Sequence, residues 1–369
     1  MTEITIIGAG YVGCALALLL KRAGINVTIL EKASEKSIIP DSRHFGIARE
    51  TRILLQDLGL WTTLQPQITE IATMQIDTTE KTLLRLGDSD HIIGRMLPAA
   101  LLHKTLRQAL QNAKVPIIFD SHCTELVSHR NHVEISTNKG ALITTPLLIA
   151  ADGMHSGTRE LAGIDLEVRD YHQNAQQWRI VHTQPHENQA FEVLLPHGPY
   201  VVLPTQEPNS SKLIWCISNK NPEPCEADLI SLFPTQLGEV EMLESLGQYP
   251  LSFQRAKACH QNRVVLVGDA YQRVHPVAAQ GLNIGLRDAQ ALATMIIEAQ
   301  HLGLDMGSTQ LLKRFAENRR LDRQTVYSLT DFLGDKAGKP VLQKSLGMLS
   351  KVFATKPAKR IIRKAFHGE

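Results

Sequence analysis

Hydrophobic and polar positions at the start of the chain alternate in a way that predicts three elements. The apolar, β-branched run at residues 4–7 predicts a buried strand, and a similar run at residues 27–30 predicts a second. Between them, residues 14–23 are an unbroken helix-forming stretch that Gly24 can cap. The pattern therefore predicts a strand–helix–strand unit, the building block of a parallel sheet.

Similar patterns predict further elements along the chain. Apolar runs at residues 147–151 and 263–267 each lead into a polar turn and predict two more buried strands. Short β-like runs between residues 165 and 258, separated by Pro, Gly, Asn and Ser, predict an antiparallel sheet, and residues 73–95 predict a hairpin. Helical spacing predicts five further helices, at residues 49–58, 98–110, 229–246, 284–299 and 311–329.

The first turn carries the glycine fingerprint of a dinucleotide site. Gly8 suits the tight turn, Gly10 lets backbone amides approach a pyrophosphate, and Gly13 lets the helix pack closely on its strand. The helix N-terminus favours the negative phosphates. Glu31 ends the second strand, where its carboxylate can bind an adenosine ribose. An acid here favours an unphosphorylated ribose, so we expect FAD or NAD rather than NADP at this site.

Two later strands also end in polar turns. Asp152 and Gly153 follow the strand at residues 147–151, and an ordinary strand-ending turn is an equally good interpretation of them. Asp269 follows the strand at residues 263–267, and Gly281 then opens a helix, a second geometry suited to a phosphate or a ring. We assign His275 no acid–base role, because a histidine before proline is often a packing or hydrogen-bonding group.

Composition limits the class of protein. With 369 residues, 43% hydrophobic and 21% charged, the chain can build two intertwined globular domains. A net charge of +2 argues against nucleic-acid binding, and five cysteines without a CxxC pair indicate reduced thiols. The fingerprint lies too close to the start for a signal peptide, and no apolar run is long enough to span a membrane. We expect a cytoplasmic protein whose membrane contact, if any, is peripheral and on the inner face.

Three motifs in this order are more specific than any one of them. The chain carries GAGYVG near the start, ADGMHSGTR in the middle and VGDAYQRVHPVAAQGLNIGLRD late. Together they resemble the FAD-dependent aromatic hydroxylases, the class A flavoprotein monooxygenases. The resemblance is greatest to the ubiquinone-biosynthesis hydroxylases, through DSRHFGIARETRILLQDLGLW and QPHENQAFEVLLPHGPYVVLPT. It covers about residues 4 to 330.

The resemblance implies how the early motifs bind the cofactor. Arg43 would lie beside the flavin. Asp152 and Gly153 would touch both the FAD pyrophosphate and the nicotinamide cofactor. Four residues would hold the ADP half of FAD: Gly8, Gly10, Gly13 and Glu31.

The resemblance also implies roles in the late motif. Asp269 would bind the ribityl chain, and Pro276 would sit over the flavin. Gly281, Leu282 and Asn283 would offer backbone amides to the N1–C2=O edge of the ring. Reduced flavin is anionic at that edge, and a helix N-terminus stabilises the charge.

These observations predict an α/β fold in which a Rossmann-like FAD-binding domain is interleaved with an antiparallel β-sheet substrate domain. The FAD-binding domain would comprise residues 1–72, 96–164 and 259–330, and the substrate domain residues 73–95 and 165–258. A basic amphipathic helical segment, residues 331–369, would form the C-terminus.

The implied reaction is the hydroxylation of an aromatic ring. NAD(P)H would reduce FAD, O₂ would add to give a flavin C4a-hydroperoxide, and a polyprenylated phenol would take the distal hydroxyl. No catalytic side chain and no metal ligand set is assigned. The chain has no second clear GxGxxG, so NAD(P)H would bind transiently. Other quinone-biosynthesis proteins are candidate partners.

Two alternatives stay open. Another flavoenzyme of the same fold would act on a different aromatic metabolite or reduce a prenyl chain. A hydroxylase-like subunit would keep the fold and serve as a scaffold. The scaffold alternative rests on departures from the family pattern: Tyr271 stands where a small residue is usual, and Ala279 where glycine is usual. Ala99 and Ala100 replace an Asn-Arg-like pair.

The end of the chain is basic and amphipathic. From Lys339 onward, eight basic residues face a single acid, Glu369, and interleave with apolar side chains. This pattern suits an anionic membrane surface or an acidic partner. A terminal helix packed on its own protein is an equally good interpretation.

Overall fold

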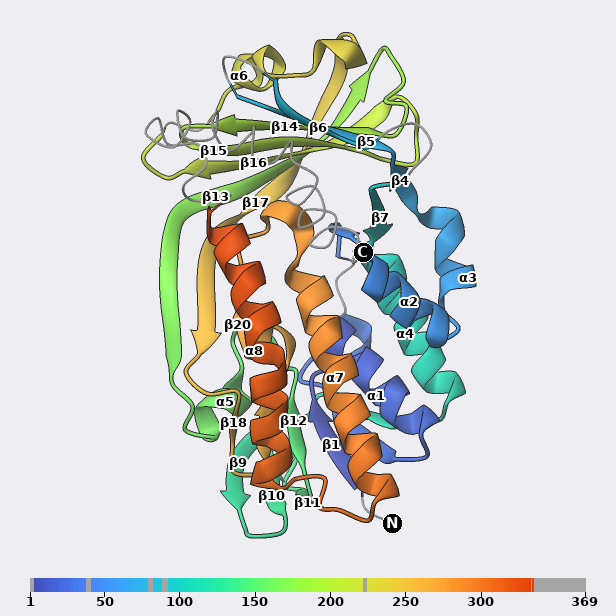
Figure 1. The fold of residues 1–369 in the computed structure, drawn as a ribbon, viewed down its shortest axis with the longest axis vertical. Coiled ribbons are helices and arrows are strands. Elements are labelled where there is room, and N and C mark those ends of the chain that lie inside the picture. Colours follow the sequence, from blue (N-terminus) through green and yellow to red (C-terminus); the bar gives the residue numbers. More distant parts are fainter. Residues whose placement is uncertain are drawn as a thin grey trace.

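A six-stranded sheet forms the lower half of the molecule in Figure 1. The computed structural model describes residues 3–37, 41–78, 82–87, 92–221, 224–332 and 334. Neighbouring strands of this sheet are parallel, except for the antiparallel edge pair β18–β19. The predicted strand–helix–strand unit is confirmed, with β1 and β2 in parallel register. In sheet order the strands are β18 (His260–Gln261), β19 (Val264–Leu266), β12 (Leu148–Ala150), β1 (Glu3–Ile7), β2 (Asn26–Leu30) and β8 (Ile117–Ile118).

Helices cover one face of the parallel sheet and a small sheet covers the other. The helical layer shares one large apolar core with the sheet. Its helices are α1 (Tyr11–Arg22), α2 (Arg49–Asp57), α3 (Trp61–Leu64), α4 (Ala99–Asn112), α7 (Gly281–His301) and α8 (Thr309–Asp331). On the opposite face, Val133 and Ile135 pack on Ile7, Leu30 and Leu148. They belong to a three-stranded sheet of β9 (Cys123–Ser128), β10 (Val133–Thr137) and β11 (Leu142–Thr145).

A second, eight-stranded sheet forms the upper half of the molecule (Figure 1). It is antiparallel apart from one parallel pair, β14–β5, and the β5–β6 hairpin that the sequence predicts supplies its edge. The 17-residue strands β13 and β17 run down from it toward the parallel sheet. In sheet order the strands are β20 (Gln272–Arg273), β17 (Val240–Ala256), β13 (Leu166–His182), β16 (Ser210–Ser218), β15 (Gly198–Pro204), β14 (Gln189–Leu195), β5 (Thr73–Asp77) and β6 (Thr82–Leu86).

Short elements complete the fold. A three-stranded sheet of β3 (His44–Gly46), β7 (Gly94–Pro98) and β4 (Thr69–Ile71) lies between the two large sheets. Helices α5 (Gly157–Leu161) and α6 (Glu226–Ser231) follow β12 and β16 in the chain. The outer face of the eight-stranded sheet packs aromatic and aliphatic side chains against α6 and the segment after it, including Trp178, Phe191, Leu229 and Phe233.

The helix predicted for residues 229–246 is wrong. The helix α6 ends at Ser231, and a short 3-10 helix, Thr235–Leu237, is followed by Gly238 in a left-handed conformation (φ 75°). Pro234 and Gly238 both disfavour a continuous helix. From Val240 onward the chain is the long strand β17, because its backbone pairs with β13.

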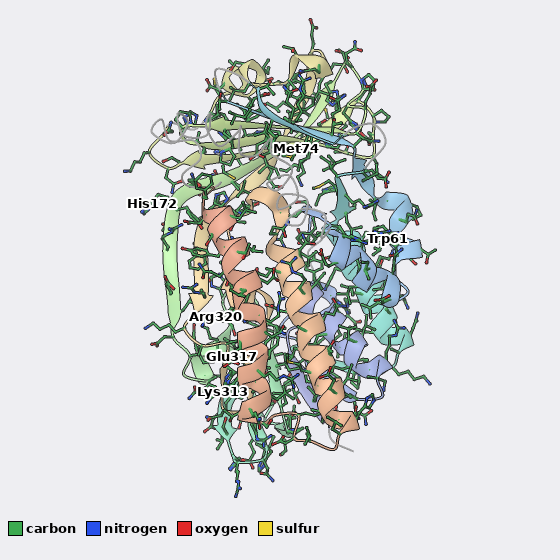
Figure 2. The ribbon with its side chains drawn as sticks, in the orientation of Figure 1. Trp61, Met74, His172, Lys313, Glu317 and Arg320 are labelled. Carbon is green, nitrogen blue, oxygen red and sulfur yellow. The ribbon has the colours of Figure 1, made fainter. Side chains whose placement is uncertain are left out.

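The helix α8, near the end of the described residues, exposes charged side chains to solvent on one face only. Lys313, Glu317 and Arg320 lie along its exposed face, as Figure 2 shows. Arg319 and Arg323 of the same helix are buried against Asp288 of α7, at 2.7 Å and 3.0 Å. A buried arginine needs such a partner, so this ion pair ties α8 to α7.

Among the described residues, no helix is long and apolar enough to cross a membrane. The helix α8 ends at Asp331, so nearly all of the predicted basic segment 331–369 lies outside the described residues. The suggestion that this segment contacts a membrane stays a prediction.

Candidate functional site

A cavity of about 500 Å³ lies between the parallel sheet and the inner face of the eight-stranded sheet. It opens where β1, β12 and β19 end, the edge at which parallel α/β sheets bind ligands. The eight-stranded sheet contributes a largely aliphatic wall that includes Ile76, Leu194, Val201 and Ile214. Eight of the twelve predicted site residues line this cavity: Gly10, Arg43, Gly153, Asp269, Pro276, Gly281, Leu282 and Asn283.

Gly8 and Gly13 make the close packing that the fingerprint predicts. A Cβ atom on Gly13 would lie 2.1 Å from the Gly8 carbonyl oxygen. A Cβ atom on Gly8, whose φ is 105°, would lie 2.5 Å from the carbonyl oxygen of Ala151 at the end of β12. Both glycines therefore serve the junction of β1, α1 and β12 rather than the cavity wall.

Gly10 and Glu31 are placed differently. A Cβ atom on Gly10 would have no neighbour within 4 Å, so this position faces open space beside the N-terminus of α1. The Glu31 carboxylate accepts hydrogen bonds from the backbone amides of Ala9 (2.6 Å) and Ala33 (2.8 Å). These bonds fix the acid at the end of β2, and each oxygen keeps a lone pair for a ribose hydroxyl.

Asp152 does not line the cavity. Its carboxylate accepts hydrogen bonds from the Ser156 hydroxyl (2.5 Å) and the Thr158 amide (3.1 Å), so it organises the start of α5. Gly153, with φ 82°, turns the backbone into the cavity wall. The structure thus gives Asp152 a supporting position and Gly153 a lining one.

Asp269 faces the cavity from a deep position. Its side chain is surrounded by protein yet reachable by solvent through the cavity. Burial raises the pKa of this carboxyl, and the charges of Arg273 and Arg43 oppose the rise. Arg43 itself pairs with Asp41, and although burial alone would raise the Asp41 pKa, hydrogen bonds from Arg43 lower it to about 2. Asp269 therefore faces the cavity near two arginines, a suitable environment for hydroxyl and phosphate groups.

The N-terminus of α7 points its free amides toward the cavity. The first backbone bond of this helix joins the Ile284 amide to the Gln280 carbonyl, so the amides of Gly281, Leu282 and Asn283 precede it. These three residues line the cavity. The helix dipole adds partial positive charge there, so this end can stabilise an anionic ring edge.

Asn283 also holds three segments together through its side chain. Its Oδ1 accepts from the Ala48 amide (3.0 Å) and the Thr51 hydroxyl (2.8 Å). Its Nδ2 donates to the carbonyls of Gly46 (2.8 Å) and Ala279 (2.9 Å). No local sequence pattern predicts this second role, because three of the four contacts join positions more than two hundred residues apart.

The structure accommodates both departures in the late motif. Ala279 adopts φ 49°, a conformation that costs an alanine about 1 kcal/mol relative to a relaxed backbone. Its methyl group points at Gly46, where a Cβ atom would lie 2.7 Å away. Tyr271 is not on the cavity wall and packs its ring under the Arg323 guanidinium at 4.0 Å. Neither residue fills the cavity.

His275 is buried and hydrogen-bonded at both ring nitrogens. Its Nε2 lies 3.1 Å from the Gln173 Oε1, and its Nδ1 accepts from the Val277 amide at 3.2 Å. Because Nδ1 accepts, Nε2 carries the proton in this arrangement. The ring also meets Tyr171 edge to face. These contacts suit a structural role.

Polar residues on the eight-stranded sheet complete the cavity wall, and no sequence motif predicted them. Lys212 is buried, burial lowers its pKa to about 8, and its Nζ donates to the Ser42 carbonyl at 2.9 Å. Gln177 donates to the Tyr249 hydroxyl at 3.2 Å. Glu192 is buried, and burial raises its pKa to about 7. The sequence signal available for Lys212 and Glu192 was a single charged residue within an otherwise apolar strand.

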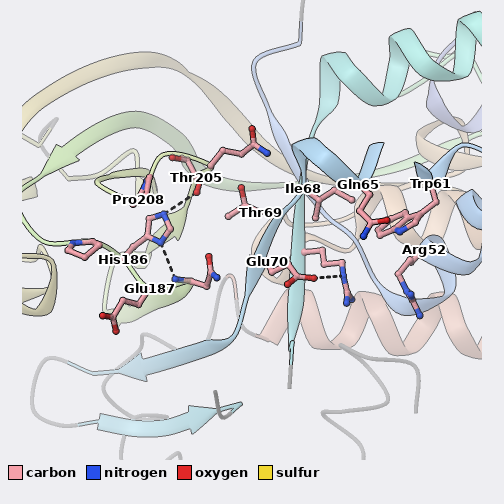
Figure 3. Close-up of a pocket in the computed structure, with 14 residues that line it drawn as sticks. Arg52, Trp61, Gln65, Ile68, Thr69, Glu70, His186, Glu187, Thr205 and Pro208 are labelled. Atoms are coloured by element: carbon pink, nitrogen blue, oxygen red, sulfur yellow. Dashed lines mark hydrogen bonds and ion pairs between the residues drawn. The ribbon is translucent and has the colours of Figure 1, made fainter. Parts of the chain in front are cut away.

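A larger hollow, of about 810 Å³, lies on the side of the molecule where α2, α3 and β4 meet the β15–β16 turn. Figure 3 shows contacts between its polar groups: Glu70 pairs with Arg95 at 3.5 Å, and His186 lies 3.0 Å from the Thr205 carbonyl. It contains none of the predicted site residues. Arg95 lines both hollows, so this groove adjoins the cavity without being its chemical centre.

Comparisons with known proteins agree with the geometry of the cavity. A family model described as FAD binding domain matches residues 1–329. The chain is 30% identical to ubiquinone hydroxylase UbiL of Rhodospirillum rubrum over 348 residues, covering 90% of this chain and 81% of the relative. It is also 30% identical to 3-demethoxyubiquinol 3-hydroxylase of Escherichia coli over 370 residues, covering 95% and 94%.

The similarity extends to solved structures. Superposition on p-nitrophenol 4-monooxygenase PnpA of Pseudomonas putida DLL-E4 gives a TM-score of 0.76 at 20% identity and covers 98% of this chain and 97% of that one. At this identity the likeness shows the fold.

The contrast between the two glycines predicts two different defects. Gly10→Val places its side chain in open space, so the protein should fold but lose FAD, because the side chain stands where the pyrophosphate approaches. Gly13→Val forces α1 away from Gly8 and should lower the stability of the apoprotein. Flavin absorbance per protein and thermal melting separate the two effects. Normal FAD content in Gly10→Val would show that the fingerprint is misassigned.

Asp269 and His275 should respond oppositely to truncation. Asp269→Ala should leave the fold intact and weaken flavin binding or misplace the ring, because the acid faces the cavity. His275→Ala should cost about 1–3 kcal/mol of stability through its lost buried hydrogen bonds and leave a working enzyme. Flavin titration, melting and turnover are the measurements. Lost turnover in His275→Ala, with FAD content and melting temperature unchanged, would instead assign the histidine a chemical role.

Proposed function

This chain belongs to the FAD-binding family of aromatic hydroxylases that includes the ubiquinone hydroxylases, and from that premise we propose that it hydroxylates the ring of a polyprenylated phenol in ubiquinone biosynthesis. The observation that carries the proposal is 30% identity to two ubiquinone-pathway hydroxylases over nine-tenths or more of this chain. NAD(P)H and O₂ are the co-substrates.

Three features of the chain fit FAD. The open position at Gly10 leaves room for a pyrophosphate beside the N-terminus of α1. The Glu31 carboxylate stands at the end of β2, the position from which an acid binds the ribose in dinucleotide-binding folds. The amides at Gly281, Leu282 and Asn283 face the same cavity as Asp269. FAD, when bound, supplies the electron transfer from NAD(P)H and the activation of O₂.

The protein's contribution to the reaction is binding, orientation and exclusion of water. The α7 N-terminus stabilises negative charge on the ring edge, and Asn283 holds Gly46 and Ala279 in place around that end. Arg43 and Asp269 provide polar contacts from the side of the parallel sheet. No nucleophilic side chain or metal is required for these steps.

The aliphatic wall of the cavity supports an apolar, tailed substrate. The strands β5, β6, β14, β15 and β16 all contribute apolar side chains to it. Burial of such surface contributes about 25 cal/mol per Å² of apolar area removed from water, so a prenylated phenol gains more than a small polar metabolite. The same wall argues against a hydrophilic substrate.

Loss of the protein should change the quinone pool of its source organism in a defined way. A deletion strain should accumulate a quinone precursor that lacks one ring oxygen, and the wild-type chain should restore the product. The Gly10→Val chain is the control for a scaffold role, because it should fold without FAD. Mass spectrometry of extracted quinones is the measurement. An unchanged profile in the deletion strain would refute the proposal, and full rescue by Gly10→Val would favour the scaffold alternative.

We further propose that the basic segment from Lys339 to Glu369 binds the enzyme to an anionic membrane surface, in which a polyprenylated phenol is dissolved. Each basic residue near such a surface contributes on the order of 1 kcal/mol, which salt screens. A chain truncated after Gly338 should keep FAD but bind anionic vesicles less, and the difference should shrink at high salt. Vesicle sedimentation measures this. Equal binding by both chains, or failure of the truncated chain to fold, would favour packing of the segment on protein instead.

A further inference from the structure

Glu192 is an acid in the middle of an apolar strand face. Along β14, Phe191 and Leu195 pack into the outer aromatic cluster, whereas Glu192 and Leu194 face the cavity. The inward position follows from the two-residue repeat of a strand. Glu192 is 7% exposed, so its carboxyl lies in the cavity wall rather than in bulk solvent.

The neighbours of Glu192 on the cavity face are apolar. Its pairing partners across the sheet are Ile76 of β5 and Val201 of β15. Ile214 of β16 follows Val201 in the same row, and Gln177 of β13 comes next. Directly opposed residues in adjacent strands have Cβ atoms about 5 Å apart, so the carboxyl is flanked by aliphatic side chains on both sides.

Within the described part of the chain, Glu192 Oε1 is buried and has no hydrogen-bond partner. Burial raises the pKa of this carboxyl to about 7. Burial and the charge of Glu192 together raise the pKa of the Cys216 thiol to about 12. The two side chains therefore lie near one another. Other titratable or charged groups face the same cavity from the surrounding elements: Tyr11, Arg43, His44, Arg95, Lys212, Tyr249, Asp269 and Arg273.

An unpartnered buried carboxyl opposes folding, because desolvation is not offset by a hydrogen bond. A leucine at this position would match Leu194 two residues along the strand and would carry no such cost. The carboxyl is therefore available to a ligand in the cavity. A ring hydroxyl of an aromatic substrate is the complementary group in a cavity that is otherwise aliphatic at this wall.

We propose that the Glu192 carboxyl is the positioning residue for the aromatic ring: it binds the ring hydroxyl of the substrate and thereby sets which ring carbon faces the flavin. This inference rests on the proposed function and deepens it. A single directional contact on an apolar wall orients a ring that aliphatic side chains alone would let rotate.

The contact also gives the phenol proton a destination. The Glu192 carboxylate takes the proton from the phenol oxygen, and the resulting phenolate is the more electron-rich ring for oxygen attack at carbon. As the carbon–oxygen bond forms, the O–O bond of the activated oxygen breaks, and the ring oxygen becomes a ketone. The attacked carbon then loses its hydrogen as a proton to the departing oxygen atom, which leaves as water, and the ketone oxygen regains a proton from Glu192. The carboxylate ends as it began, and the oxygen and electrons come from O₂ and NAD(P)H.

Glu192→Gln keeps the size of the side chain and removes the proton acceptor. With FAD-loaded enzyme and a short-chain prenylated phenol, it should lower kcat/KM by about 10²-fold, a usual magnitude for loss of an acid–base group. It should also give a mixture of hydroxylated positions and release more H₂O₂ per NAD(P)H. The matched control is Val193→Ala, the next position of β14 but on its outer face, which should keep a single product.

The pH dependence provides a second readout. The carboxylate form is required, so kcat/KM of the wild type should rise through about pH 7, and Glu192→Gln should lack that step. Because the pKa of Glu192 is higher in the folded than in the unfolded protein, its contribution to stability is most favourable below the unfolded pKa. This contribution is lost as the pH rises through about 7. The apoprotein of Glu192→Leu should lack this loss and melt at a higher temperature than wild type at pH 8.

The outcomes separate the two hypotheses. A wild-type enzyme that binds FAD but never hydroxylates a phenol would refute the proposed function. A wild-type enzyme that hydroxylates, with Glu192→Gln giving the same single product and the same pH profile, would overturn only the role of Glu192. A lower melting temperature of the Glu192→Leu apoprotein would likewise overturn it, because it would make the carboxyl a structural group.

Discussion

The arrangement of this molecule depends on a backbone contact that only glycine permits. Gly13 of α1 meets the Gly8 carbonyl, and Gly8 meets Ala151 at the end of β12, each at distances that exclude a Cβ atom. This contact brings the N-terminus of α1 and the ends of two parallel strands to one edge of the sheet. The long helix α7 then packs on α1 through the shared core. Because both helices start at this edge, two sets of free backbone amides face one cavity.

The parts that follow from local sequence were predictable. The first βαβ unit, the buried strands before Asp152 and Asp269, and the helix at Gly281 all depend on periodicity and glycine placement within short stretches. The β5–β6 hairpin and the strands after residue 165 were likewise visible as alternating runs. The helix predicted for residues 229–246 failed because pairing with β13 outweighed helical periodicity once Pro234 and Gly238 had broken the helix.

The remaining site features depend on contacts between distant segments. Three of the four hydrogen bonds of the Asn283 side chain reach residues more than two hundred positions away, and no local pattern predicts them. Ala279 breaks a local rule by taking a positive φ, and Gly46 provides the space for its methyl group. Lys212 and Glu192 break another rule, since each is a charged residue in a buried strand. Such conflicts between local preference and the fold are expected at functional sites.

The central claim is that this cavity joins oxygen to an aromatic ring, with FAD on the side of the parallel sheet and the ring on the apolar wall. Purified, FAD-loaded protein supplied with NAD(P)H, ¹⁸O₂ and a short-chain prenylated phenol tests it most directly, with mass spectrometry of the products. The account predicts a ring-hydroxylated product that carries one ¹⁸O atom. Oxidation of NAD(P)H that yields only labelled H₂O₂, or a product whose new oxygen comes from water, would contradict it.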